Sequence, residues 1–146
     1  MKKKIAFLLI ILAAIAGCSY AVNRMNDTSL HEKALNQITK NDEVRIDMKR
    51  YSDDAKVSLT DKDKVEKLLK SLSSVELKKE NMTWPSGDYA IRVYVNGVNI
   101  LGMEMLTDKN YVWINEQKGG VYKVSNQVDL CKIIEEQHLD WTIPGQ

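Results

Sequence analysis

The sequence contains 146 residues, of which 21 are lysine or arginine and 20 are aspartate or glutamate, so its formal net charge is +1. Nucleic-acid binding relies on basic residues concentrated on one surface, and the mixed charges of this chain disfavour it. No internal repeat divides the chain, and its length predicts a single domain with one hydrophobic core.

The N-terminal segment has the three parts of a secretory signal. Basic residues at positions 2–4 precede an apolar run from Ile5 to Ile15, and small residues follow at positions 16 and 17. A membrane-spanning helix needs about 17–25 apolar residues, so this run is too short for one. We predict a signal peptide over residues 1–17.

The signal ends in Ile15-Ala16-Gly17-Cys18, which resembles the bacterial lipobox. The resemblance implies that Cys18 carries a diacylglycerol thioether and becomes the first residue of the mature chain. A plain signal peptide, in which Cys18 occurs by chance, is the alternative. Removal of residues 1–17 takes away three lysines and no acid, which leaves 18 basic and 20 acidic side chains and a formal charge of −2.

The only other cysteine is Cys131, so lipidation of Cys18 excludes an intramolecular disulfide. Cys131 lies on the apolar side of a predicted helix, which favours a buried small side chain over a reactive thiol. Residues 18–28 are interpreted as the lipidated cysteine with a flexible polar tether, and residues 29–146 as the domain. Because the tether spans at most about 35 Å, the domain is expected close to the bilayer.

The first predicted elements of the domain are a helix, a strand and a turn. Ser29 and Glu32 form a capping box before apolar residues at helical spacing, which predicts a helix ending near Lys40. From Glu43 to Tyr51 apolar and charged residues alternate, the pattern of a strand with one apolar face. Residues 52–54 then favour a turn.

A second helix and a short strand follow. Thr60 with Asp63 is the predicted cap, and apolar residues between Val65 and Leu72 recur on one helical face. The apolar residues Val75 and Leu77 predict a short edge strand before a turn-rich stretch at 81–87.

The next forty residues predict an antiparallel meander. Alternating residues over 89–95 and 98–106 flank Asn96-Gly97, a strong hairpin signal because a type I′ turn needs positive φ at both central residues. Further strands are predicted at 111–116 and 121–124. A last helix capped by Ser125 or Asn126 follows, and Trp141 is expected to pack back on the domain or to lie at an interface.

Strands grouped in a meander with helices at both ends predict an α+β fold. We expect a single domain in which an antiparallel β-meander sheet is packed on one face by two or three helices. The opposite face is expected to be open to water and to carry large polar or aromatic side chains such as Arg92 and Tyr94.

The sequence lacks the common catalytic and metal-binding motifs, so an enzyme, a cofactor and a metal site are not expected. The chain lacks a Gly-x-Ser-x-Gly elbow, a His-Glu-x-x-His motif and a Cys-x-x-Cys motif. His31 and His138 lie far apart in the sequence without an obvious partner. Asp61 with Asp63 resembles the start of a calcium loop, but the required later glycine and glutamate are missing, and capping of a helix is preferred.

Aromatic residues point to a contact surface. The only phenylalanine is Phe7, in the predicted signal, whereas tryptophan and tyrosine are numerous in the meander and its entry loop. These side chains suit half-wet surfaces, because they bury an apolar body and keep a polar tip hydrated. The alternative is that they are ordinary strand residues, which tyrosine and tryptophan also favour.

A lipobox, a short tether and a compact α+β domain resemble the small lipoproteins of Gram-positive bacteria. In size and layout the chain is similar to the lantibiotic immunity lipoproteins, particularly the subtilin-immunity type. The resemblance implies a monomer on the extracellular face of the cell membrane that sequesters a cationic antimicrobial peptide without chemistry. The competing interpretation is an accessory module of the cell envelope that binds another protein or cell-wall material.

Residue type alone indicates the candidate peptide contacts. The aromatic candidates are Trp84, Tyr94, Trp113 and Trp141, and the acidic candidates are Asp53, Asp54, Asp88 and Glu104.

Overall fold

The computed structural model describes residue 13 and residues 27–145, apart from 84–86, 107, 109 and 116–118. The predicted signal peptide, Cys18 and Trp84 lie outside the described residues. The elements are β1 (Asp27–Ser29), α2 (Leu30–Lys33), a 3₁₀ helix η1 (Leu35–Gln37), β2 (Val44–Arg50), β3 (Lys56–Leu59), α3 (Lys62–Ser73), β4 (Glu76–Glu80), β5 (Gly87–Val95), β6 (Val98–Leu106), β7 (Tyr111–Ile114), β8 (Gly120–Val124) and α4 (Leu130–Glu135).

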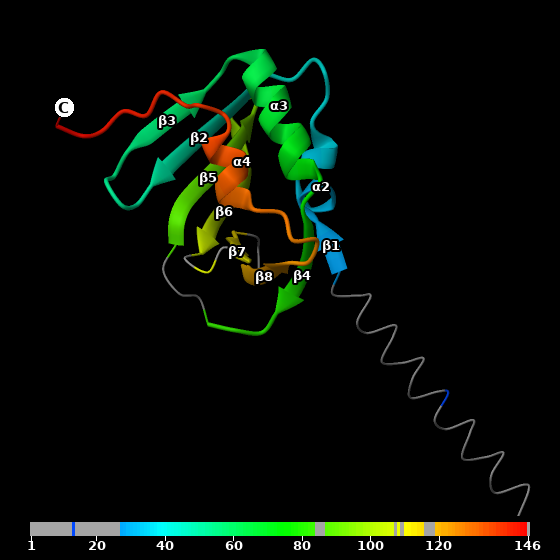
Figure 1. The fold of residues 1–146 in the computed structure, drawn as a ribbon. Coiled ribbons are helices and arrows are strands. Elements are labelled where there is room, and N and C mark those ends of the chain that lie inside the picture. The colour runs from blue at the N-terminus through cyan, green and yellow to red at the C-terminus, as the bar shows by residue number, and fades with distance from the viewer. Residues whose placement is uncertain are drawn as a thin grey trace, which may run out of the picture.

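The strands form one eight-stranded antiparallel sheet in the order β1-β4-β8-β7-β6-β5-β2-β3. Figure 1 shows α3 and α4 side by side in front of this sheet, with α2 next to α3. The predicted α+β fold, with an antiparallel meander and helices packed on one face, is therefore confirmed.

The hairpin between β5 and β6 forms where the sequence places it. Asn96 and Gly97 have φ angles of 50° and 81°, as a type I′ turn requires. The Asn96 side chain also joins this turn to the start of β2, because its Nδ2 donates to Asp42 Oδ1 at 2.8 Å and its Oδ1 accepts from the Glu43 amide at 3.0 Å. Hydrogen bonds from the Thr39 amide and from Asn96 lower the pKa of Asp42.

Helices α3 and α4 each begin with a different N-cap residue from the predicted one. Asp61, and not Thr60, precedes α3, and its Oδ1 accepts a hydrogen bond from the Lys64 amide at 3.0 Å. Asp129 caps α4 in the same way by accepting from the Lys132 amide at 3.0 Å. In each case the helix starts where an aspartate can reach the free amide three residues on.

Asn126, predicted as a possible helix cap, has a different role. Its Nδ2 donates to the Ser74 carbonyl at 2.6 Å, and its Oδ1 accepts from the Glu76 amide at 3.3 Å. The side chain therefore links the chain after β8 to the start of β4, two segments that are neighbours only in the folded sheet.

The core lies between the sheet and the helices. From β2 and β5 the side chains of Ile46, Met48, Ile91 and Val93 point into it, and each is at most 3% exposed. Cys131 on α4 is also buried, as predicted. Among the described residues no polar or charged residue is buried, so the core is formed by apolar side chains. The helix residues that close it include Leu30, Leu68, Leu72, Leu130 and Ile134.

The structure differs from the prediction in the length of the first helix, in one additional strand and in the position of β4 in the sheet. The first helix is only one turn, α2, followed by η1, because Ala34 leaves helical geometry at φ −150°. β3 was not predicted, since its four residues give only two periods of alternation. β4 is not an edge strand, because β1 pairs with its free side, and Asp27 and Thr28 of the predicted tether belong to that strand.

Candidate binding face of the sheet

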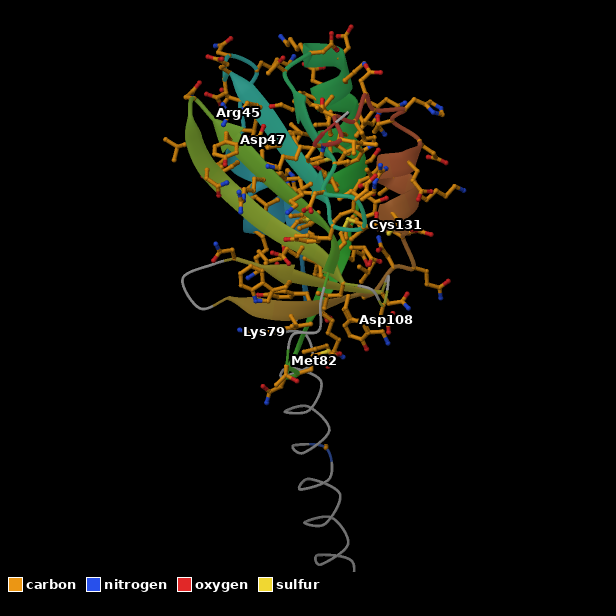
Figure 2. The ribbon with its side chains drawn as sticks, turned by 90° about the vertical axis from the view of Figure 1, so that its left-hand side faces the viewer. Arg45, Asp47, Lys79, Met82, Asp108 and Cys131 are labelled. Carbon is orange, nitrogen blue, oxygen red and sulfur yellow. The ribbon has the colours of Figure 1, made fainter. Side chains whose placement is uncertain are left out.

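The sheet has a second face that α3 and α4 do not cover. In β2 and β5 the residues between the core positions point to this side, and Figure 2 shows Arg45 and Asp47 there, across the strands from Cys131. Register extends the set to β6 and β7, where Glu104 lies opposite Trp113. We call this set the open face: Arg45, Asp47, Lys49, Ala90, Arg92, Tyr94, Gly102, Glu104, Tyr111 and Trp113.

Part of the open face is closed to solvent near Leu106 and Val121. Leu106 and Val121 occupy alternate positions relative to the core-facing residues of their strands, yet they are at most 4% exposed. Contact is thus blocked at Leu106 and Val121, whereas Lys123 of β8, which pairs with Tyr111, stays exposed on the same side.

Two groups of polar side chains on the open face are held in place by contacts with one another. In the first, Arg45 Nε lies 3.3 Å from Asp47 Oδ1, and the Ser58 hydroxyl donates to the same carboxylate oxygen. The Arg45 guanidinium lies 4.4 Å from the centre of the Tyr94 ring. Tyr94 therefore has a cation on one side, which holds the ring in place at the surface.

The second group surrounds Tyr51, which follows β2. Burial raises the pKa of Tyr51, and its hydrogen bond with Glu104 raises it further. Lys49 Nζ lies 2.6 Å from Asp54 Oδ1 and 5.1 Å from the Tyr51 ring centre. The hydrogen bond to Asp54 raises the pKa of Lys49. Glu104 is thus oriented by a tyrosine and stays on the open face opposite Trp113.

A separate cluster fixes the C-terminal tail near the β2–β3 turn. Arg50 Nε and Nη2 donate to the two carboxylate oxygens of Asp53 at 2.9 and 2.7 Å. The guanidinium lies 4.9 Å from the Trp141 ring centre, and the rings of Trp141 and Tyr89 are 6.1 Å apart. Hydrogen bonding to Arg50 lowers the pKa of Asp53. Trp141 therefore packs back on the domain, as predicted.

The structure brings together only part of the predicted contact set. Tyr94, Trp113 and Glu104 share the open face, and Asp54 lies at its rim through Lys49. Asp53 and Trp141 belong to the tail cluster.

Asp88 is half-buried at an irregularity in β5, where its carbonyl accepts from the Tyr51 amide at 2.9 Å. Sequence reasoning did not select Arg45 and Asp47 as contacts, although their alternation with apolar residues marks the same face.

A hollow of about 810 Å³ runs around the edge strand β3 and reaches the open face. Its lining carries both signs of charge, with the basic residues Lys49, Lys56, Lys64 and Arg92 and the acidic residues Asp47, Asp61 and Asp140. It contains no histidine or cysteine. Within the described parts of the chain no three histidine, cysteine, aspartate or glutamate residues are placed to hold a metal ion.

No family model, no curated protein and no solved structure matches this chain. None of the helices in the described residues has the length and apolar character needed to cross a membrane.

Proposed function

We propose that this chain is a lipoprotein, attached through Cys18 to the outer side of a Gram-positive cell membrane, that binds a cationic antimicrobial peptide of the lantibiotic class on its open face. The observation that supports this function is the division of the sheet into two faces. Helices cover one, and the other presents ordered aromatic and charged side chains to solvent.

The proposed activity is sequestration, and it requires no chemical step. Tyr94 and Trp113 offer apolar ring surface with polar tips, which suits an amphipathic peptide. Glu104 offers a carboxylate to a cationic side chain, and Tyr51 holds it in position. Protection would follow because the bound peptide no longer reaches the bilayer.

Lipidation would make this binding effective at low protein abundance. Two acyl chains give stable anchoring where one would be marginal. The chain from Cys18 to Asp27 reaches at most about 30 Å when extended. A peptide that arrives at the membrane therefore meets the domain at a raised effective concentration.

One observation favours a second candidate function. The hollow beside β3 is lined by four basic side chains and three aspartates, and its exposed Arg92 and Lys56 offer donors to the anionic groups of a partner. A cell-envelope module that binds an acidic protein segment or an anionic cell-wall polymer would use this region.

Expression in a lantibiotic-sensitive strain separates these functions. The intact protein should raise the inhibitory concentration of subtilin but not that of an unrelated detergent. The Cys18→Ala variant should fold, escape into the medium and protect less, because its local concentration is lost.

Two results would contradict the proposal. Equal sensitivity to a panel of lantibiotics with and without displayed protein would rule out immunity. Full retention of Cys18→Ala on washed membranes would rule out the lipid anchor.

A further inference from the structure

The N-terminal segment enters the domain at one end of the molecule. Asp27 is the first residue of β1 and pairs in register with Lys78 of β4. β4 continues for two residues past this pair to Glu80, and Met82 follows it. Figure 1 shows the start of β1 and the chain after β4 at the same end of the molecule. We call this part, residues 27 and 78–83, the entry end.

Covalent geometry keeps the entry end close to Cys18. The chain from Cys18 to Asp27 would span about 17 Å as a flexible coil. A compact domain of this size has a radius of gyration of about 13 Å and is about 35 Å across. If Cys18 carries a lipid in the bilayer, the relaxed tether is shorter than the domain is wide, and the entry end is the part nearest to the membrane.

An exposed apolar side chain lies at the entry end. Met82 is 45% exposed, which only Val98 exceeds among the large apolar side chains of the described residues. A single exposed apolar residue is ordinary at a protein surface, so its position decides what it implies. Figure 2 shows Met82 and Lys79 at the end of the molecule opposite to Arg45. A methionine beside a lysine suits a membrane interface, because the apolar chain is buried while the ammonium group stays in water.

Charge does not select an anionic membrane as the partner. Lys78 and Lys79 bring positive charge to the entry end, whereas Asp27 and Glu80 bring negative charge. Because the two signs offset each other, a strong attraction to anionic lipid is not expected. The short tether and the apolar side chain of Met82 favour a neutral headgroup layer as the occupant.

We propose that the entry end rests on the outer surface of the bilayer with Met82 in the headgroup layer. This inference rests on the proposed lipid attachment and assigns an orientation to the domain. Arg45 of the open face lies at the opposite end of the molecule from Met82, so the open face extends away from the lipid. It then stands upright on the membrane and is accessible to a peptide that arrives along the surface.

The test measures how close single labelled positions lie to the headgroups. The lipidated protein is placed in nanodiscs of neutral lipid that carry a nitroxide on the headgroup, and a fluorophore is attached to one introduced cysteine. Cys131 is buried and Cys18 is blocked by the lipid, so the introduced cysteine is the reactive thiol.

The two most exposed apolar residues provide the measurement and its matched control. In Met82→Cys the label should lose about half or more of its fluorescence, because interfacial groups lie within about 10 Å of the headgroups. Val98 pairs with Val95 beside the Asn96-Gly97 turn, and Val95 pairs with Val44 next to Arg45. The label in Val98→Cys should therefore lose only about a tenth or less of its fluorescence at the far end of the domain.

A charge at position 82 tests the methionine side chain itself. Thr83 is exposed, and a label in Thr83→Cys reports the same end of the domain. Addition of Met82→Glu should reduce the quenching of this label about twofold or more, because a carboxylate is costly to bury among apolar chains.

The outcomes separate this orientation from the function on which it rests. Loss of the protein from the nanodisc, or labelling of a second thiol at Cys18, would overturn the lipid attachment and the orientation together. Equal quenching at positions 82 and 98 in a retained protein would overturn the orientation and leave the attachment and peptide binding standing. Unchanged quenching after Met82→Glu would overturn the contact of Met82 with the headgroups.

Discussion

The two faces of the sheet use alternate residues of the same strands for opposite purposes. In β2 and β5 the covered face holds Ile46 and Val93, which are fully buried, whereas the open face holds Asp47 and Arg92 between or beside them. The first set excludes water and stabilises the fold, and the second remains hydrated and available for contact. Stability and the proposed recognition are therefore expected to respond to different single substitutions.

The largest expected effect is on the covered face. Leu68 on α3 is fully buried in the core, and Leu68→Ala should lower the free energy of unfolding by about 2–5 kcal/mol through lost burial and a cavity. Arg92→Ala on the open face should change it by at most about 0.5 kcal/mol. Urea unfolding of both variants measures the difference, and similar losses would contradict the division of roles.

A smaller effect is expected at the C-terminal tail, where Trp141 and Tyr89 pack against the edge of the core on the covered face. Trp141→Ala removes the ring that packs between Arg50 and Tyr89 and should lower the free energy of unfolding by about 1–2 kcal/mol. Pro144→Ala, an exposed change three residues further along the tail, is the control and should have little effect. Equal melting temperatures for the two variants would show that the tail adds no stability.

The smallest and most condition-dependent effect concerns Asp53. Its pKa is lowered in the folded protein, first by the hydrogen bond from Arg50, so its ionised form is favoured by folding. The stabilisation is present above the unfolded pKa of about 3.9 and is lost as the pH falls through the lower folded pKa.

Asp53→Asn should therefore be less stable than the unaltered protein at pH 7, with the difference shrinking below about pH 4. Urea unfolding from pH 7 to pH 2 measures this difference. In an Arg50→Gln background the same substitution should show a much weaker pH dependence, because the hydrogen-bond donor is gone. A difference that persists unchanged at pH 2 would argue against the ion pair as its source.

The sequence predicted most elements that depend on local chemistry. The alternation in β2 and the Asn96-Gly97 turn were sufficient to locate a strand and a hairpin. It missed β3, because four residues that pair with one neighbour carry little pattern. It also placed helix caps one to four residues early, since any nearby serine, threonine or asparagine fits the pattern equally well.

The predicted contact set stays a prediction, and the structure shows only which of its residues lie together. Tyr94, Trp113 and Glu104 share the open face because β5, β6 and β7 are neighbours in the sheet. Asp53 and Trp141 instead meet Arg50 near the β2–β3 turn. Nothing in the spacing of these residues indicates which side of the sheet the tail will reach.

The amino-acid sequence alone determined the α+β class and the apolar side of each long strand, because these depend on short-range periodicity and turn chemistry. Only the tertiary structure decided that β2 lies beside β5, that β1 pairs with the free side of β4, and that Tyr94, Glu104 and Trp113 share one face of the sheet. These features depend on pairing between segments far apart in the chain, where the free energy of the assembled sheet selects the neighbours.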